Sequence, residues 1–205
     1  LKTTGLISGD GDHRESVRHH IAMLELAATL DRFFVMGSPL APGAFFCGGS
    51  DSTAEDRRAG HFAGRGFDLR QAFLSCVGEA AEYRAMSRMG HDPRVTAGES
   101  GSVVTGRSLV SGASVTVAAG SVLRDAATGD GPSSTGYAAG PTIAAATESA
   151  FLECVERDAI ARWWQGETTP VDIAASDPIV TDMDGLRRPA QRPVGFADIS
   201  PSGAL

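Results

Sequence analysis

The spacing Ser-x3-Glu-x2-Glu occurs twice in this chain, each time inside an apolar stretch. The first copy is SCVGEAAEY at residues 75 to 83, and the second is SAFLECVER at residues 149 to 157. On a helix, steps of four and seven residues return to within about 40° and 20° of the starting direction, so the three side chains share one stripe. The repeated spacing therefore predicts two helices that each carry an acidic stripe on an otherwise apolar surface.

The apolar residues around each stripe, such as Val77 and Val155, predict helices that are buried on most sides. A solvated face is the plainer interpretation of an acidic helix, but such a face normally carries Lys or Arg four residues away from the carboxylates. Few basic residues are placed to do this here: Arg84 lies beside the first stripe and Arg157 beside the second.

If both stripes are buried and face each other, their carboxylates converge and need a cation, because unpaired buried charges are costly. Magnesium suits this chemistry, since it takes one or two protein carboxylates together with phosphate oxygens. A di-iron bundle is the rival, but it needs Glu-x-x-His, and the third residue after Glu79 and after Glu153 is another glutamate. The stripes therefore predict a site for magnesium and a nucleotide.

Hydrophobic periodicity and the placement of Gly and Pro predict the remaining elements. The tail RPVGFADIS is a further strand signal. We expect an α+β fold in which antiparallel strand pairs pack with two long motif helices that face a nucleotide site. The predicted elements are a helix from Glu15 to about Phe34, a hairpin leading into Gly64, a helix over 69–89, a loop over 92–105, a strand pair at about 107–124 and a helix over 142–164.

Composition narrows the class of partner and the compartment. The net charge of -7 would repel a polyanion, so we expect no nucleic-acid partner. No apolar run approaches the ~20 residues of a membrane span, and the first residues do not resemble a signal peptide. Three cysteines without a C-x-x-C pattern favour the cytoplasm.

Two longer blocks resemble the signatures of the YcaO family. The first, GRGFDLRQAFLSCVGEAAEYRA at 64–85, is similar to a signature of Gly-basic-Gly, a short turn and then a helix with Ser-x3-Glu-x2-Glu-Arg. The second, STGYAAGPTIAAATESAFLECVERDAIARWW at 134–164, is similar to a loop and helix ending in Glu-x2-Glu-Arg-Asp-Ala. Both blocks stand in the family's order, which makes the resemblance specific.

The resemblance implies an enzyme that binds ATP and Mg²⁺ and activates a backbone amide of a ribosomally made precursor peptide by phosphorylating the amide oxygen. The product would be an azoline or a thioamide. A companion activator protein and a homodimer are further partners that the family allows. Because the resemblance covers the first half of a typical member, we expect residues 1–205 to form a single YcaO-like domain, the N-terminal half of a longer protein.

The resemblance also implies roles for individual residues. Tyr83 stands where the family usually has Arg, while Pro141 and Ala145 stand where many members have Asn and Glu. These departures keep open the alternative of a non-catalytic scaffold that binds a peptide or a partner protein. The implied magnesium ligands are Glu79, Glu82, Glu153 and Glu156, and the implied ATP-binding residues are Ser16, Ser75, Ser149 and Arg157.

Overall fold

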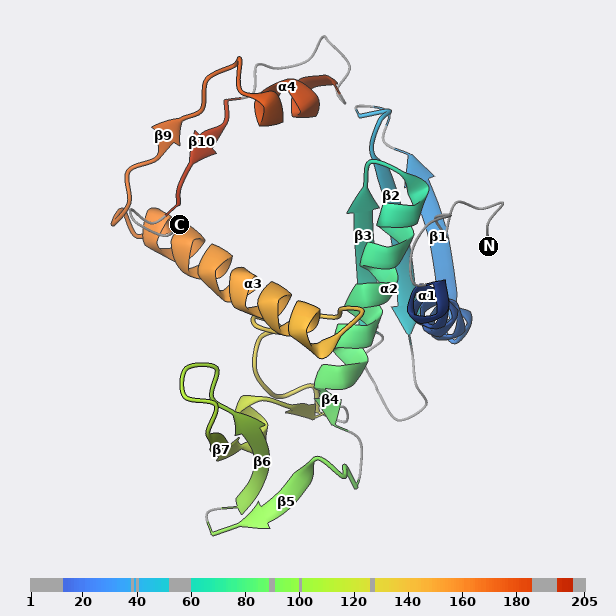
Figure 1. The fold of residues 1–205 in the computed structure, drawn as a ribbon, viewed down its shortest axis with the longest axis vertical. Helices are drawn as coiled ribbons and strands as arrows, with labels where there is room; N and C mark the ends of the chain where they lie inside the picture. The colour runs from blue at the N-terminus through green and yellow to red at the C-terminus, as the bar shows by residue number, and fades with distance from the viewer. Residues whose placement is uncertain are drawn as a thin grey trace.

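The chain combines helices with small, mostly antiparallel sheets, as the computed structural model shows (Figure 1). Its description covers residues 13–37, 39, 41–51, 60–88, 91–99, 101–125, 128–185 and 195–200, without the side chains of 13–17 and 184. The expected α+β class is therefore confirmed, including its antiparallel strand pairs.

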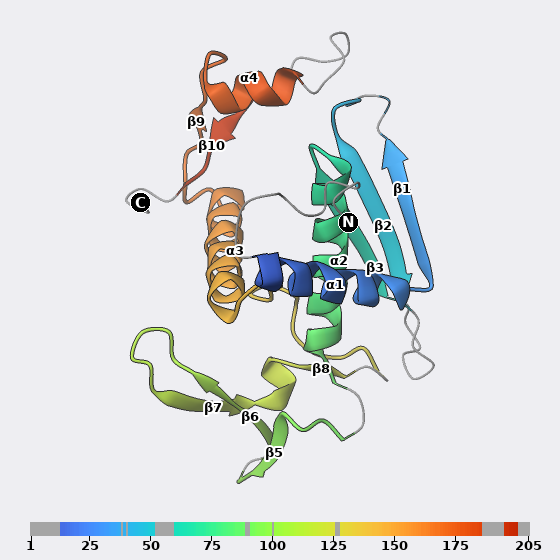
Figure 2. The same cartoon turned by 45° about the vertical axis from the view of Figure 1, so that its right-hand side comes forward.

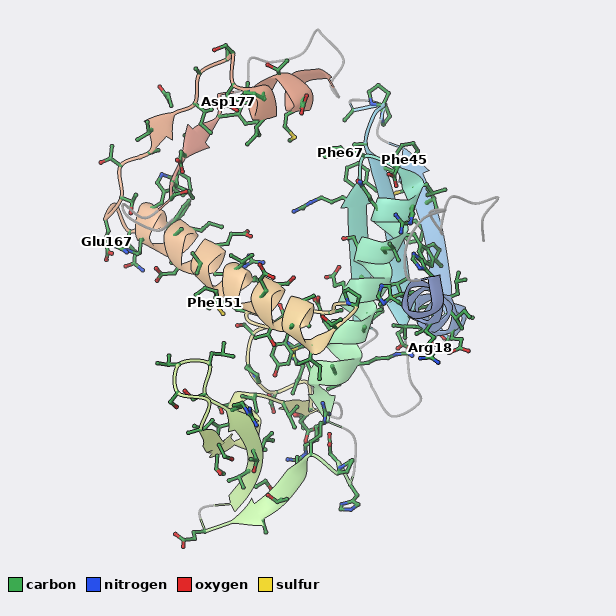
Figure 3. All side chains as sticks on the ribbon, viewed as in Figure 1. Arg18, Phe45, Phe67, Phe151, Glu167 and Asp177 are labelled. Atoms are coloured by element: carbon green, nitrogen blue, oxygen red, sulfur yellow. The ribbon has the colours of Figure 1, made fainter. Side chains whose placement is uncertain are left out.

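The first sheet consists of β1 (Arg32–Gly37), β2 (Phe45–Asp51) and β3 (Gly60–Gly66), all antiparallel in the order β1-β2-β3. Helix α2 (Leu69–Met86) lies across one face of this sheet (Figure 1). Phe45 and Phe67 lie at the same end of the sheet, next to the start of α2 (Figure 3). The hairpin expected before the first motif helix is thus β2–β3. The core between sheet and helix contains Cys47, Phe62, Ala72, Cys76 and Ala80.

Two local features place α2 on the sheet. Asp68 caps the helix, because its Oδ1 accepts a hydrogen bond from the backbone N–H of Gln71 at 2.7 Å. Gly64 lets strand and helix touch, because a Cβ at that position would stand 2.1 Å from the carbonyl oxygen of Ala72. The Gly-basic-Gly segment at the end of β3 therefore fixes how closely the first acidic stripe lies beside this strand.

Helix α1 (His13–Ala28) crosses α2 (Figure 2). Arg70 Nη2 on α2 lies 3.1 Å from His20 Nε2 on α1 and ties the two helices together. The predicted helix to about Phe34 is wrong at its end. The segment RFFVMG instead forms β1, because its aromatic and β-branched residues pair with β2.

The second sheet lies beyond the C-terminal end of α2 (Figure 1). It consists of β5 (Val95–Gly98), β6 (Gly101–Arg107) and β7 (Ser114–Ala118). The loop predicted over 92–105 is wrong, because this segment pairs as β5 and the start of β6. The strand pair predicted at about 107–124 is therefore only partly right, because its first strand, β6, ends at Arg107, and a turn with Gly112 at φ 70° leads into β7. The 3-10 turn η1 (Ala119–Ser121) follows β7, and β4 (Ser87–Arg88) pairs in parallel with β8 (Arg124–Asp125).

Helix α3 (Ile143–Trp164) matches its predicted range, and Thr142 caps it through a 3.1 Å hydrogen bond from Ala145 N–H. The prediction that this helix is buried on most sides is wrong. Ala159 is its only buried residue, and Phe151, labelled in Figure 3, is 56% exposed. The reason is that none of the described helices and strands packs closely against α3. The chain ends with β9 (Val171–Asp172), α4 (Pro178–Gly185) and β10 (Ala197–Asp198), the last of which pairs back with β9.

Across the described ranges, no helix combines the length and the apolar character that crossing a membrane requires.

Candidate functional site

A cleft of about 810 Å³ lies where β3, α2, the loop before α3 and α3 meet. Its wall contains carboxylates from both motif helices together with cationic and aromatic side chains. The residues that line it are Phe46, Gly60, His61, Phe62, Ala63, Gly64, Arg65, Ser75, Glu79, Glu82, Tyr83, Met86, Arg124, Ser134, Tyr137, Glu153 and Arg157.

Glu79 and Glu82 enter the cleft from α2, and each is held by a backbone amide of another segment. Glu79 Oε2 accepts from the N–H of Ala63 on β3 at 2.8 Å. Glu82 Oε1 accepts from the N–H of Ala139, in the loop before α3, at 2.7 Å. One oxygen of each carboxylate is therefore fixed, and among the described residues no donor reaches the other.

The pKa of Glu82 shows that the carboxylates of the cleft interact electrostatically. Burial raises the pKa of the Glu82 carboxyl above its usual range. The hydrogen bond from Ala139 lowers this pKa, whereas the charges of Glu153 and Glu79 raise it further. The acidic stripes of the two motif helices are thus coupled, and a cation in the cleft would relieve their repulsion.

Glu153 enters the cleft from α3. Its Oε2 accepts from the N–H of Gly136 at 3.0 Å, and its Oε1 lies 3.3 Å from Arg157 Nη2, one turn along the helix. Gly136 has a φ of 84°, a conformation that favours glycine, and a Cβ there would stand 3.1 Å from Cys154 Sγ. The Ser-Thr-Gly segment before α3 therefore positions the second acidic stripe.

Only part of the second stripe lines the cleft. Arg157 lies about 40° to one side of Glu153 around the helix, whereas Ser149 and Glu156 lie about 40° and 60° to the other side. Since the cleft is lined by Glu153 and Arg157, Ser149 and Glu156 fall outside the lining and are exposed. The first stripe differs, because Ser75, Glu79 and Glu82 all line the cleft. The side chain of Ser16 lies outside the described residues.

Arg84 does not serve the cleft. Its Nε donates to Asp51 Oδ2 at 2.6 Å, on the side of α2 that faces the sheet. Tyr83, the preceding residue, lines the cleft instead. The basic residue that follows the first stripe is therefore part of the link between α2 and β2.

The donor set fits magnesium only together with oxygens from a ligand. Among the described residues, no three His, Cys, Asp or Glu side chains lie close enough together to hold one metal ion. Magnesium usually keeps one or two protein carboxylates and completes its coordination with water or phosphate oxygens. Glu79, Glu82 and Glu153, spread along one cleft, suit that mode of binding better than an all-protein metal cage.

Sequence reasoning missed several residues of the lining. Arg65 and Tyr137 stand inside the two motif blocks, where their place next to a predicted site could have drawn attention to them. Arg124 and His61 carry no such signal. They reach the cleft only because β3 packs against α2 and β8 pairs with β4, directly after α2.

Comparison with known proteins agrees with this geometry. The family described as YcaO cyclodehydratase, ATP- and Mg²⁺-binding, matches residues 98–203, which is just over half of the chain. The chain belongs to the YcaO family. The resemblance drawn from the two motif blocks is thereby confirmed, and ATP and Mg²⁺ are the cofactors that the YcaO description names.

A solved structure shows the same fold. YcaO from Methanopyrus kandleri, bound with AMPPCP and Mg²⁺, aligns with a TM-score of 0.68 at 19% sequence identity. The alignment covers 84% of this chain and 50% of the other, so the present chain spans about half the length of that YcaO. No curated protein matches the chain.

Proposed function

We propose that this chain contributes to ATP- and Mg²⁺-dependent activation of a peptide backbone amide, by phosphorylation of the amide oxygen, during maturation of a ribosomally made peptide. The observation that carries the proposal is the cleft in which Glu79, Glu82 and Glu153 each receive a backbone N–H from a facing segment. Membership of a family described as ATP- and Mg²⁺-binding supports it.

The residues of the chain have separable tasks in this proposal. Glu79 and Glu82 would hold Mg²⁺ from α2, and Glu153 would hold it from α3, because each carboxylate lines the cleft. When bound, ATP supplies the phosphoryl group that turns the amide oxygen into a leaving phosphate, and Mg²⁺ offsets the charge of the phosphates. Arg157 is positioned at the rim to contact phosphate oxygens, for which its planar fork is suited.

A nucleophile on the peptide or an external sulfide would add to the activated amide carbon, giving an azoline or a thioamide. The amide oxygen then leaves on phosphate. A synthetic copy of a short peptide encoded beside the gene, carrying ¹⁸O in its backbone amides, tests this step. We expect ¹⁸O to appear in the phosphate released from ATP when the complete gene product, Mg²⁺ and the peptide are combined.

The alternatives give different results in the same experiment. Phosphate without ¹⁸O would contradict amide activation and indicate simple ATP hydrolysis. Magnesium-dependent nucleotide binding with no phosphate release, with or without the peptide and a companion protein, would support the non-catalytic scaffold instead.

A further inference from the structure

Arg124 occupies the end of the cleft that lies beyond the glutamates of α2. It is the first residue of β8, and its Cα pairs with that of Ser87, the first residue after α2. Glu79, Glu82 and Met86 follow one another along α2 toward this end, and all line the cleft together with Arg124. A ligand that extends from the carboxylates toward the end of α2 would therefore meet Arg124.

The backbone around Arg124 is held by a tight turn. The N–H of Asp125 donates to the carbonyl of Asp130 at 2.8 Å, and Arg124 Nη2 donates to the carbonyl of Pro132 at 3.2 Å. Gly131, at φ 147°, lies against the base of the arginine, because a Cβ at Gly131 would stand 2.6 Å from the Arg124 Cα. These contacts fix the position of the Arg124 backbone and of the Nη2 end of its guanidinium.

The Nε of Arg124 is buried and has no hydrogen-bond partner among the described residues. A buried donor of a charged group normally has an acceptor, and leaving it without one is unfavourable. The carboxylates of the cleft do not supply the acceptor, since Arg124 forms no ion pair within the described part of the chain. Arg157, by contrast, is paired with Glu153. Because the Arg124 side chain lines the cleft and no described carboxylate pairs with it, its guanidinium is placed to meet an anion that enters the cleft.

We propose that Arg124 binds a phosphate group of the nucleotide whose magnesium the cleft glutamates hold. This assignment rests on the proposed function, because the phosphate comes from ATP. A guanidinium suits the role, since its planar fork can donate to two phosphate oxygens at once and keeps its charge when partly buried. Arg124 is thus a binding residue contributed by β8, outside both motif helices.

The test is the affinity of the complete gene product for AMPPCP with Mg²⁺, measured by calorimetry. Arg124→Gln should weaken binding at least about tenfold, because a charge-assisted hydrogen bond is lost. Arg124→Lys should bind with intermediate affinity, because the charge remains and the fork is lost. Arg107→Gln, which changes an exposed arginine on β6 outside the cleft, is the matched control and should bind like the wild type.

Thermal unfolding of the same variants separates binding from structure. If Arg124 only supports the turn through Pro132, both substitutions lower Tm and leave the AMPPCP affinity of the folded protein unchanged. That result would overturn the assignment. Reduced affinity at a Tm close to that of the wild type supports it.

Failure of the proposed function can be told apart from failure of this assignment. If AMPPCP binding depends on Mg²⁺ and on Glu82 but not on Arg124, the assignment is wrong and the proposed function stands. If the wild type binds no AMPPCP, the proposed function falls, and inorganic triphosphate with Mg²⁺ becomes the probe. If the wild type binds triphosphate and Arg124→Gln binds it more weakly, Arg124 still belongs to a phosphate site. If neither protein binds triphosphate, or both bind it equally, the assignment of Arg124 is wrong.

Discussion

Arg157 and Glu153 stand one turn apart on α3, with 3.3 Å between Nη2 and Oε1, and both side chains line the cleft. The side chains of Arg157 and Glu153 are 56% and 24% exposed, so the ion pair contributes little to folding. In the proposed function, the same two groups would meet a phosphate and its metal. Their role in binding can therefore be separated from their role in stability.

Arg157→Lys should change the free energy of unfolding by less than about 0.5 kcal/mol, since exposed ion pairs are weak. It should nevertheless cost about 1.5–3 kcal/mol in the use of ATP, because a bidentate contact to a charged group is lost. ATP-dependent phosphate release at matched stability measures this. The control is Arg162→Lys, since Arg162 lies on the same helix but outside the cleft and pairs with Glu167 at 3.4 Å. Equal activity of the wild type and Arg157→Lys would show that Arg157 only forms an ion pair with Glu153 and does not contact ATP.

Glu82→Gln should leave the metal-free protein as stable as the wild type or more stable at neutral pH. The pKa of Glu82 is raised, so its charged form is less favourable in the folded chain than in the unfolded one, and this cost is present above the folded pKa. The amide oxygen of Gln can still accept from Ala139 N–H. Thermal unfolding in EDTA tests this. A clear drop in Tm would show that the carboxylate stabilises the fold.

Asp92 stabilises the fold outside the cleft. Hydrogen bonds from Arg94 lower the pKa of the Asp92 carboxyl to about 2, and Arg94 also donates to the carbonyls of Ala85 and Ser87 at the end of α2. A depressed pKa gives stability that is present above the unfolded pKa and is lost as pH falls through the folded one. Stability should therefore decline between about pH 4 and pH 2, the interval between the unfolded and folded pKa values.

Replacing Asp92 tests the same contact directly. Asp92→Asn should lower the free energy of unfolding by about 1–2 kcal/mol at neutral pH and flatten the acid decline, while AMPPCP affinity stays unchanged. The exposed Asp172 on β9 gives the control Asp172→Asn, which should do neither. An unchanged acid decline in Asp92→Asn would mean that another carboxyl causes it.

Gly64→Ala should be strongly destabilising, by about 2 kcal/mol or more, because the added Cβ has no room beside α2. It would stand 2.1 Å from Ala72 O and 2.2 Å from Cys76 N, which are backbone atoms that cannot swing aside. Gly37→Ala on β1 is the matched control, since nothing lies within 4 Å of its added Cβ. Denaturant unfolding of both variants measures the difference, and equal stabilities would show that α2 can move off β3 at little cost.

Sequence patterns predicted well what local spacing determines. The range of the motif helix α3 follows from such short-range signals. The strand RFFVMG was missed because its apolar run also continues the preceding helical pattern, and only pairing with β2 decides between the two. Val103 and Val104 were also not predicted as part of a strand. Their place in β6 depends on pairing with β5 on one side and β7 on the other, which the local sequence does not show.

The candidate site shows the same division. The spacing of Glu79, Glu82 and Glu153 predicted side chains that do line one cleft. The spacing does not show which side of α3 faces the cleft. The prediction therefore grouped Ser149 and Glu156 with Glu153. In the structure, Arg157 lines the cleft beside Glu153 instead. Arg124 was out of reach, because its place depends on the pairing of β8 with β4.

In the proposed function, Glu79 and Glu153, from two different helices, bind one magnesium–nucleotide complex. The most direct measurement is the calorimetric affinity for AMPPCP as Mg²⁺ is varied, in the complete gene product. Glu148→Gln is the matched control, because Glu148 is an exposed glutamate on α3 outside the cleft. We predict binding that requires Mg²⁺ and weakens at least about tenfold in both Glu79→Gln and Glu153→Gln, but not in the control. AMPPCP binding that is independent of Mg²⁺, or equal in the wild type and all three variants, would show that these two glutamates do not hold a magnesium–nucleotide complex.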